Sequence, residues 1–286
     1  MSVRTPVARA KKRSGRRGTV AKVLLLSVVA FIVNLPILTI ILNSLQTNDA
    51  LMISSSIIPT HVTFSNYSDL LGQTDFPSFF KNSMIVGGAS TVIAVIVAGF
   101  AGYALSRFRM RAMNVYGSGI LLLQMFPIIL GILPLFLILK TLMLTGTYWA
   151  AVVIYISVQV PFATWLFRGF FASIPVDLEE AAWIDGCSRL GGVFRVVLRV
   201  STPGLVAVGI LSFLFAWNDY LIANIFLNQQ DLMTVPVGIQ MFTQQYASEW
   251  ATIMAASTMA MVPVLIVFMF VQRYMVQGMT AGAVKG

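Results

Sequence analysis

Charged residues are scarce in this 286-residue chain, at 10% of the total, whereas soluble domains carry about 25%. Hydrophobic residues make up 58%, and the mean hydropathy is +0.85. Outside the apolar runs, no stretch is long enough and apolar enough to bury a core of its own. The composition therefore predicts one all-α integral membrane domain with the lipid bilayer as its solvent.

Several catalytic and binding elements are also missing. A single cysteine, Cys187, excludes an internal disulfide, and the lone His61 has no companion ligands for a metal. The chain lacks the Gly-x-x-x-x-Gly-Lys-Ser/Thr phosphate loop, and its apolar segments carry no catalytic triad or carboxylate pair. We expect no catalytic residues and no bound cofactor, so any energy must come from a partner.

Six apolar segments are each long enough to cross a bilayer, which takes about 20 residues. Only the fifth of them contains a charged residue, Asp219. Basic residues precede the first segment, but its apolar run is too long for a cleaved signal peptide. The segments are Val23–Leu42, Ser83–Leu105, Val115–Leu139, Tyr148–Phe167, Pro203–Ile225 and Ala251–Val271.

Seventeen of the nineteen Lys and Arg residues fall in the two tails and in alternate loops, which predicts that this side is cytoplasmic. Both termini are then cytoplasmic in a multi-pass protein of the cell (inner) membrane. We divide the chain into a basic tail (1–22), a first helix with its outer loop (23–82) and a core domain (83–286). The net charge of +9 comes largely from the tail, which suits anionic lipid rather than nucleic acid.

The loop between the fourth and fifth segments, residues 172–202, is far longer than a simple helix connection of about 2–8 residues. Its sequence predicts a short helix in which Asp177 and Glu180 form a capping box and Gly186 ends the last turn. A second amphipathic helix follows, with Leu190, Phe194 and Val197 on one face. Such a loop is able to transmit a movement of a soluble partner to the membrane helices.

The loop resembles the docking loop of ABC importer permeases in its Glu180-Ala181-Ala182 motif, in Gly186 and in the spacing to Val196 and Leu198. It departs from that pattern at Arg199, where the family usually has proline. Three further motifs extend the resemblance over about residues 80–286. With them, the chain resembles the shorter of the two permease subunits of maltose-type carbohydrate importers. They are Phe80-Lys81-Asn82-Ser83, Ala216-Trp217-Asn218-Asp219 and Gly282-Ala283-Val284-Lys285-Gly286.

The resemblance implies a type I ABC importer permease with six transmembrane helices and a cytoplasmic coupling helix over 178–185. It implies a second permease, two ABC ATPase subunits that bind ATP and Mg, and an extracytoplasmic solute-binding protein that delivers a sugar or polyol. The ATPase-docking residues would be Asp177, Glu179, Glu180, Ala181, Ala182, Asp185 and Gly186.

A carboxylate inside a membrane helix costs about 2.5–3.5 kcal/mol unless it faces partners or water, so Asp219 must face inward. Either it lines the translocation path with Trp217 and Asn218, or it locks the bundle through an interhelical hydrogen bond. Gln124 and Gln159 are weaker path candidates. The stripe Ala94, Ala98, Gly102 predicts close helix packing.

The outer loop 226–250 is rich in polar side chains and is the candidate contact for the binding protein. Its candidate residues are Gln229, Gln230, Gln244, Gln245 and Tyr246. The alternative function is an ion-coupled secondary transporter that uses Asp219 as its coupling carboxylate. That alternative leaves the long loop 172–202 without a purpose.

Overall fold

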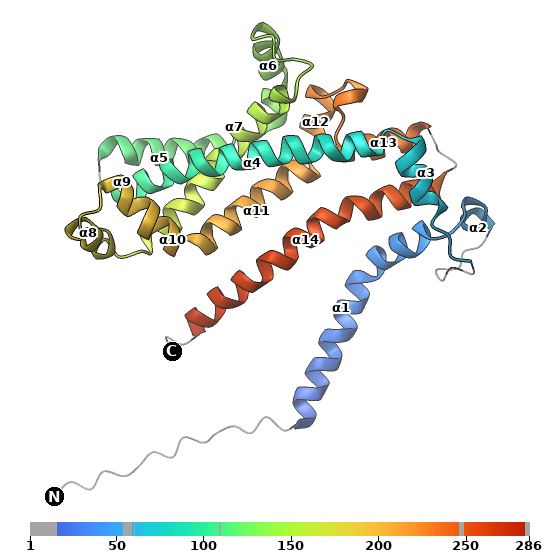
Figure 1. The fold of residues 1–286 in the computed structure, drawn as a ribbon, viewed down its shortest axis with the longest axis horizontal. Coiled ribbons are helices and arrows are strands. Elements are labelled where there is room, and N and C mark those ends of the chain that lie inside the picture. Colours follow the sequence, from blue (N-terminus) through green and yellow to red (C-terminus); the bar gives the residue numbers. More distant parts are fainter. Residues whose placement is uncertain (1–15, 54–58, 60, 109, 246–248, 284–286) are drawn as a thin grey trace, which may run out of the picture.

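The computed structural model describes residues 16–53, 59, 61–108, 110–245 and 249–283, and these residues form helices and no strand (Figure 1). The elements are α1 (Arg16–Ser44), α2 (Asn48–Ile53), α3 (Ser65–Gln73), α4 (Phe76–Arg107), α5 (Arg111–Gln124), α6 (Ile128–Thr141), α7 (Tyr148–Ala172), α8 (Asp177–Ile184), α9 (Arg189–Gly192), the π-helix η1 (Val193–Val197), α10 (Leu198–Val200), α11 (Thr202–Asn218), α12 (Leu221–Phe226), the 3₁₀-helix η2 (Gln230–Leu232), α13 (Val235–Gln245) and α14 (Trp250–Ala283).

Four of these helices are long and apolar enough to cross a membrane: α1, α4, α7 and α14. Two bent pairs of helices are also long and apolar enough when each pair is counted as one span. The total is then six candidate spans. The first pair is α5 with α6, and the second joins Arg189–Val200 to α11. The prediction of an all-helical fold with six spans is therefore confirmed, but two of the six are not single straight helices.

The third predicted segment is interrupted at a proline. α5 ends at Gln124, α6 begins at Ile128, and the two axes differ in direction by 101°. Pro127 has no N–H group to continue the helical hydrogen bonds, and its φ of −65° with ψ of 118° leaves the helical region. The fifth predicted segment also breaks, because α11 ends at Asn218 and Asp219 is extended. The prediction of continuous helices over Val115–Leu139 and Pro203–Ile225 is wrong.

α4 and α7 pack closely along their length and form the centre of the bundle. Ala94 and Ala98 are fully buried, and a Cβ atom added at Gly102 would lie 2.6 Å from the Cβ atom of Phe167. The small side chains therefore let the two helix backbones approach each other. The close packing predicted from this stripe is confirmed.

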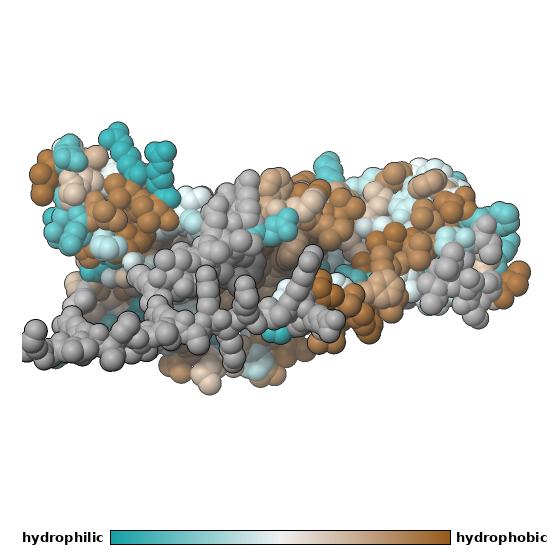
Figure 2. Space-filling model, turned by 90° about the horizontal axis from the view of Figure 1, so that it is seen from below, coloured by the Kyte–Doolittle hydropathy of each residue, from teal (hydrophilic) through white to brown (hydrophobic). Residues whose placement is uncertain are grey.

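α1 lies at the edge of the bundle, where its neighbour is α14 (Figure 1). Its apolar side chains are largely exposed, with Leu24, Leu25 and Leu26 each more than half exposed. Figure 2 shows apolar side chains over much of one face of the molecule and hydrophilic ones chiefly toward the two ends of its long axis. Hydrocarbon, which offers no hydrogen bonds, is the solvent that such a surface suits.

At the α2 end of the bundle, Asn82 connects three elements. Its amide nitrogen donates to the carbonyl oxygens of Asp231 and Met233, both at 2.9 Å, and its Oδ1 accepts from the Tyr148 hydroxyl at 2.7 Å. The neighbouring Ser83 hydroxyl accepts from the Val235 amide at 2.8 Å. α4 thus holds the start of α7 and the segment before α13 in place, which gives Asn82 and Ser83 a structural role.

Replacing Gly102 with valine should separate α4 from α7, because the new side chain would meet Phe167 and the backbone of Thr164 and Arg168. We expect the free energy of unfolding to fall by about 1–3 kcal/mol, as for other overpacked cores. Thermal unfolding of the purified protein in detergent measures the change. Gly99→Val is the matched control, since a Cβ at Gly99 meets nothing within 4 Å. Equal melting temperatures for the two variants would contradict this packing.

Candidate functional site

The first candidate site is α8, which lies at one end of the bundle beside α9 (Figure 1). Asp177 is its first helical residue, and the N-cap position belongs to Val176, which makes no side-chain cap bond. The predicted capping box of Asp177 and Glu180 is therefore wrong, because the helix begins one residue earlier than a cap at Asp177 requires. Asp177, Glu179 and Glu180 still place three carboxylates at the positive end of the helix.

α8 ends as predicted at Gly186, whose φ of +88° favours glycine. The Gly186 amide donates to the Trp183 carbonyl at 3.1 Å, and the Cys187 amide donates to the Ala182 carbonyl at 2.9 Å. These two bonds form a Schellman motif, which satisfies carbonyl groups that the helix leaves without partners.

Glu179 is buried, with 1% of its surface exposed, and it is paired with the end of α4. Its Oε1 lies 2.6 Å from Nε and 2.5 Å from Nη2 of Arg107, and its Oε2 accepts from the Tyr103 hydroxyl at 2.7 Å. Arg107 also donates to the carbonyl oxygens of Phe171 at 3.0 Å and Ile174 at 3.2 Å. One guanidinium group thus joins α4, the end of α7 and α8. Both charges are paired and hydrogen-bonded, as burial requires.

Sequence reasoning did not identify Tyr103. It used Arg107 only as one of the basic residues that predict the orientation of the chain in the membrane. The available signal was the helical spacing of Glu179 and Ala182, three residues apart and both buried. A carboxylate on the inward face of an amphipathic helix needs a cationic partner. The basic residues after the second apolar segment were the nearest candidates.

The remaining side of α8 is exposed to solvent. We call its residues Leu178, Glu180, Ala181, Ile184 and Asp185 the exposed α8 face. Ile184 is 87% exposed, and Leu178 is 44% exposed. Glu180, Ala181 and Asp185 are exposed as well. Of the predicted docking residues, the structure therefore separates Glu179 and Ala182, which face the bundle, from Glu180, Ala181 and Asp185, which do not.

The segment after α8 differs from its prediction. Ser188 caps α9 by accepting from the Gly191 amide at 3.1 Å, and the chain then forms the π-helix η1. The wider π turn changes which side chains share a face. As a result Val197 is buried, whereas Leu190 is 65% and Phe194 57% exposed. The predicted common face of these three residues is wrong.

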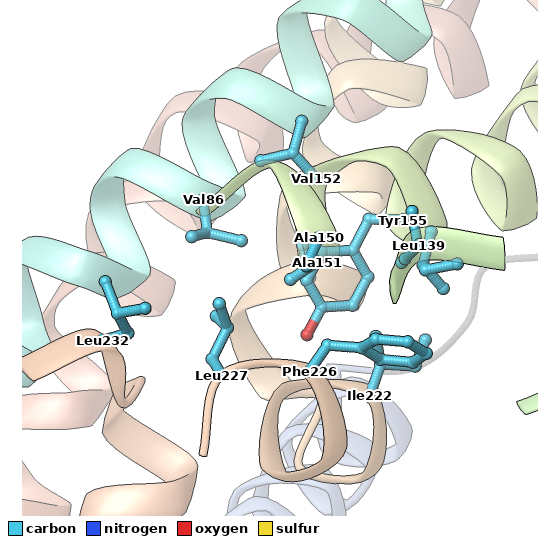
Figure 3. Packing of buried hydrophobic residues seen from close by; sticks show 12 residues of the cluster. Val86, Leu139, Ala150, Ala151, Val152, Tyr155, Ile222, Phe226, Leu227 and Leu232 are labelled. Carbon is cyan, nitrogen blue, oxygen red and sulfur yellow. The ribbon is translucent and has the colours of Figure 1, made fainter. Parts of the chain in front are cut away.

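Asp219 lies at the break between α11 and α12, and its side chain accepts hydrogen bonds from α7 and from α12. Its Oδ2 accepts from the Tyr155 hydroxyl at 3.0 Å and from the amides of Ile222 at 2.8 Å and Ala223 at 3.3 Å. Figure 3 shows the Tyr155 ring among apolar neighbours, with its hydroxyl group directed toward α12. Asp219 therefore caps α12 and links it to α7.

The other path candidates fall in two places. Gln124 and Gln159 line one cavity of about 620 Å³ beside the α5–α6 break. Trp217 and Asn218 line a second cavity of about 350 Å³ together with residues of α13 and α14. The Trp217 indole also donates to the Ala260 carbonyl at 3.2 Å. The structure thus brings the two glutamines together but not with the Trp217–Asp219 group.

The candidate contacts for a binding protein are only partly described. Gln230 donates to Asp75 Oδ2 at 2.6 Å, and the Gln229 side chain lies against Gly146. Gln244 and Gln245 belong to α13, but their side chains lie outside the described part of the chain, as does Tyr246.

A family model described as a binding-protein-dependent transport system inner membrane component matches residues 90–281. The trehalose transport system permease protein SugB of Mycobacterium tuberculosis is 35% identical over 95% of this chain and 99% of its own length. The sulfoquinovosyl glycerol transport system permease protein SmoH of Agrobacterium fabrum is 35% identical over 88% of each chain. A crystal structure of a bacterial ABC transporter involved in alginate import matches with a TM-score of 0.78, 26% identity and coverage of 94% and 99%.

Glu179→Ala should lower the free energy of unfolding by about 3–5 kcal/mol, since it leaves the buried Arg107 charge without its partner. The control is Glu180→Ala, which removes an exposed carboxylate and should change it by less than about 0.5 kcal/mol. Thermal unfolding in detergent measures both. The double variant Arg107→Met/Glu179→Leu should regain much of the loss. Equal effects of the two single variants would refute the buried ion pair.

Proposed function

Since this chain belongs to the family of binding-protein-dependent transport system inner membrane components, we propose that it is the permease subunit of an ABC importer for a sugar or related polyol. Its relatives named above are permeases for trehalose and sulfoquinovosyl glycerol, and the matching structure belongs to a transporter of a polysaccharide. The shared chemistry of these cargoes is a set of hydroxyl groups on a sugar framework.

The observation that carries this proposal is the pairing of an exposed apolar surface with a rigid attachment to the bundle. Ile184 and Leu178 on the exposed α8 face suit a hydrophobic cleft in an ATPase subunit. On the other side of the same helix, Glu179 is fixed to Arg107. A displacement of α8 by the ATPase therefore moves α4 and the end of α7 together.

The remaining partners follow from the same family membership. A second permease would complete the pathway, and a solute-binding protein would deliver the sugar at the α2 end, next to Gln229 and Gln230. Two ATPase subunits would bind ATP and Mg at the α8 end, which we place in the cytoplasm with both termini. The phosphate loop that such ATPases need has no counterpart in this sequence.

Ion coupling through Asp219 has less support. Its carboxylate already accepts three hydrogen bonds, from Tyr155 and from two amides of α12. A coupling group must release and rebind its ion during each cycle, and here that would disrupt the start of a helix. We propose that Asp219 holds the bundle together and that the path runs beside Gln124 and Gln159.

The exposed α8 face gives a direct test of docking. Ile184→Asp places a charge in the proposed ATPase contact and should weaken the binding of the ATPase subunits to the permease, measured without the binding protein, by at least tenfold, the effect of about 1.4 kcal/mol. Ile53→Asp in α2 is the matched control, because both isoleucines are 87% exposed but lie at opposite ends of the bundle (Figure 1). Equal ATPase affinities of the two variants would show that α8 is not the docking element.

The energy source is tested with the full complex in proteoliposomes, using labelled trehalose, maltose, arabino-oligosaccharide and diacetylchitobiose in turn. We expect saturable uptake of one of these sugars, dependent on both ATP and the binding protein. Uptake that continues without ATP would refute the ATP-driven mechanism. Failure to take up any sugar, with uptake of another solute, would refute the cargo class.

A further inference from the structure

The cavity beside the α5–α6 break contains a buried polar group without a partner. Gln159 is 5% exposed, and among the described residues neither Oε1 nor Nε2 of its amide has a hydrogen-bond partner. Buried amides without hydrogen bonds are costly and uncommon in folded proteins. Gln159 is one of the residues that line the adjacent cavity, and its amide atoms are themselves buried, so a ligand in the cavity would meet the amide when the side chain turns toward that space.

The lining of this cavity combines aromatic rings with a few neutral polar groups. Phe126, Phe162 and Phe215 contribute rings, and Gln124, Gln159 and Ser212 contribute amides and a hydroxyl. Among the described residues, none that lines the cavity is charged. Its volume of about 620 Å³ lies within the range of about 300–1,000 Å³ that is usual for small-molecule sites of mixed apolar and polar lining.

The position of the cavity also suits a transported ligand. It lies where the span formed by α5 and α6 is interrupted, and residues of α7 and α11 line its other sides. Non-helical backbone at membrane depth is tolerated where it lines a cavity, and interrupted helices are a recurring source of substrate sites in transporters. The 101° bend between α5 and α6 is therefore a structural reason for a site at this point.

We propose that this cavity is a substrate subsite, in which the Gln159 amide binds hydroxyl groups of the sugar and the phenylalanine rings contact its apolar face. This subunit then contacts the sugar itself. It does not only line the pathway opposite a binding site that belongs to the second permease. The inference rests on the proposed function. An acyl chain of a lipid would fill the cavity without giving Gln159 a partner, and an inorganic ion would find no charged ligand there.

The test measures sugar binding at the cavity in the assembled complex, without the binding protein. Ser157 lines the cavity, and its hydroxyl already donates to the Val153 carbonyl of its own helix at 2.8 Å. Ser157→Cys is therefore a mild reporter, and Cys187→Ser removes the only native cysteine of this chain, so that labelling of this subunit reports on position 157. The rate of labelling by N-ethylmaleimide is measured against increasing concentrations of the sugar that the wild-type complex imports fastest in proteoliposomes.

We expect the sugar to slow labelling at least fivefold, and Gln159→Leu to raise the half-protecting concentration at least tenfold. Thr164→Val is the matched control and should change it by less than twofold. Thr164 is also on α7, fully buried and without a hydrogen-bond partner among the described residues, but it does not line the cavity.

Two results would overturn the subsite while leaving the proposed function intact. Protection that is equal in the Gln159→Leu and Thr164→Val variants would exclude Gln159 as a sugar ligand. A lack of protection by an imported sugar would show that the sugar does not occupy the cavity. By contrast, a wild-type complex that imports no sugar would refute the proposed function itself.

Discussion

The arrangement of this molecule depends on one buried ion pair, between Arg107 at the end of α4 and Glu179 on α8. Burying two charges is costly unless each has an opposite charge and further hydrogen bonds. Here Tyr103 and the carbonyl oxygens of Phe171 and Ile174 complete the set. The pair therefore fixes α8 to two membrane helices, and its cost is offset only while all three elements remain in place.

The close contact of α4 with α7 makes that pair geometrically possible. Gly102 lies five residues before Arg107 and lets the α4 backbone approach Thr164 and Phe167. Phe167 and Phe171 stack with centroids 5.7 Å apart, and Tyr103 meets Phe171 edge-on at 6.0 Å. The apolar packing thus brings the α7 terminus within reach of the guanidinium group. The exposed α8 face is therefore connected to the bundle through contacts that are both polar and apolar.

The sequence was sufficient to predict the features that arise from long or local patterns. Length and hydropathy predicted six spans, small residues four apart predicted close helix packing along one face of α4, and Gly186 predicted the end of α8. The helix break at Pro127 was not predicted, because proline within a membrane helix also occurs as a mild kink. The π turn at Val193–Val197 has no simple sequence signature. The Arg107–Glu179 pair joins residues 72 apart in sequence, so it depends on tertiary packing.

The order of these residues along the chain has a consequence for biosynthesis. Arg107 is translated 72 residues before Glu179, which at about 5–20 residues per second is a delay of about 4–14 s. With the α8 end in the cytoplasm, as proposed above, α4 enters the bilayer during this time with an unpaired guanidinium group, and this charge favours keeping that end of the helix in the cytosol. Only when α8 emerges from the ribosome does the charge acquire its internal partner. The same residue thus serves first as a signal for insertion and later as a part of the finished bundle.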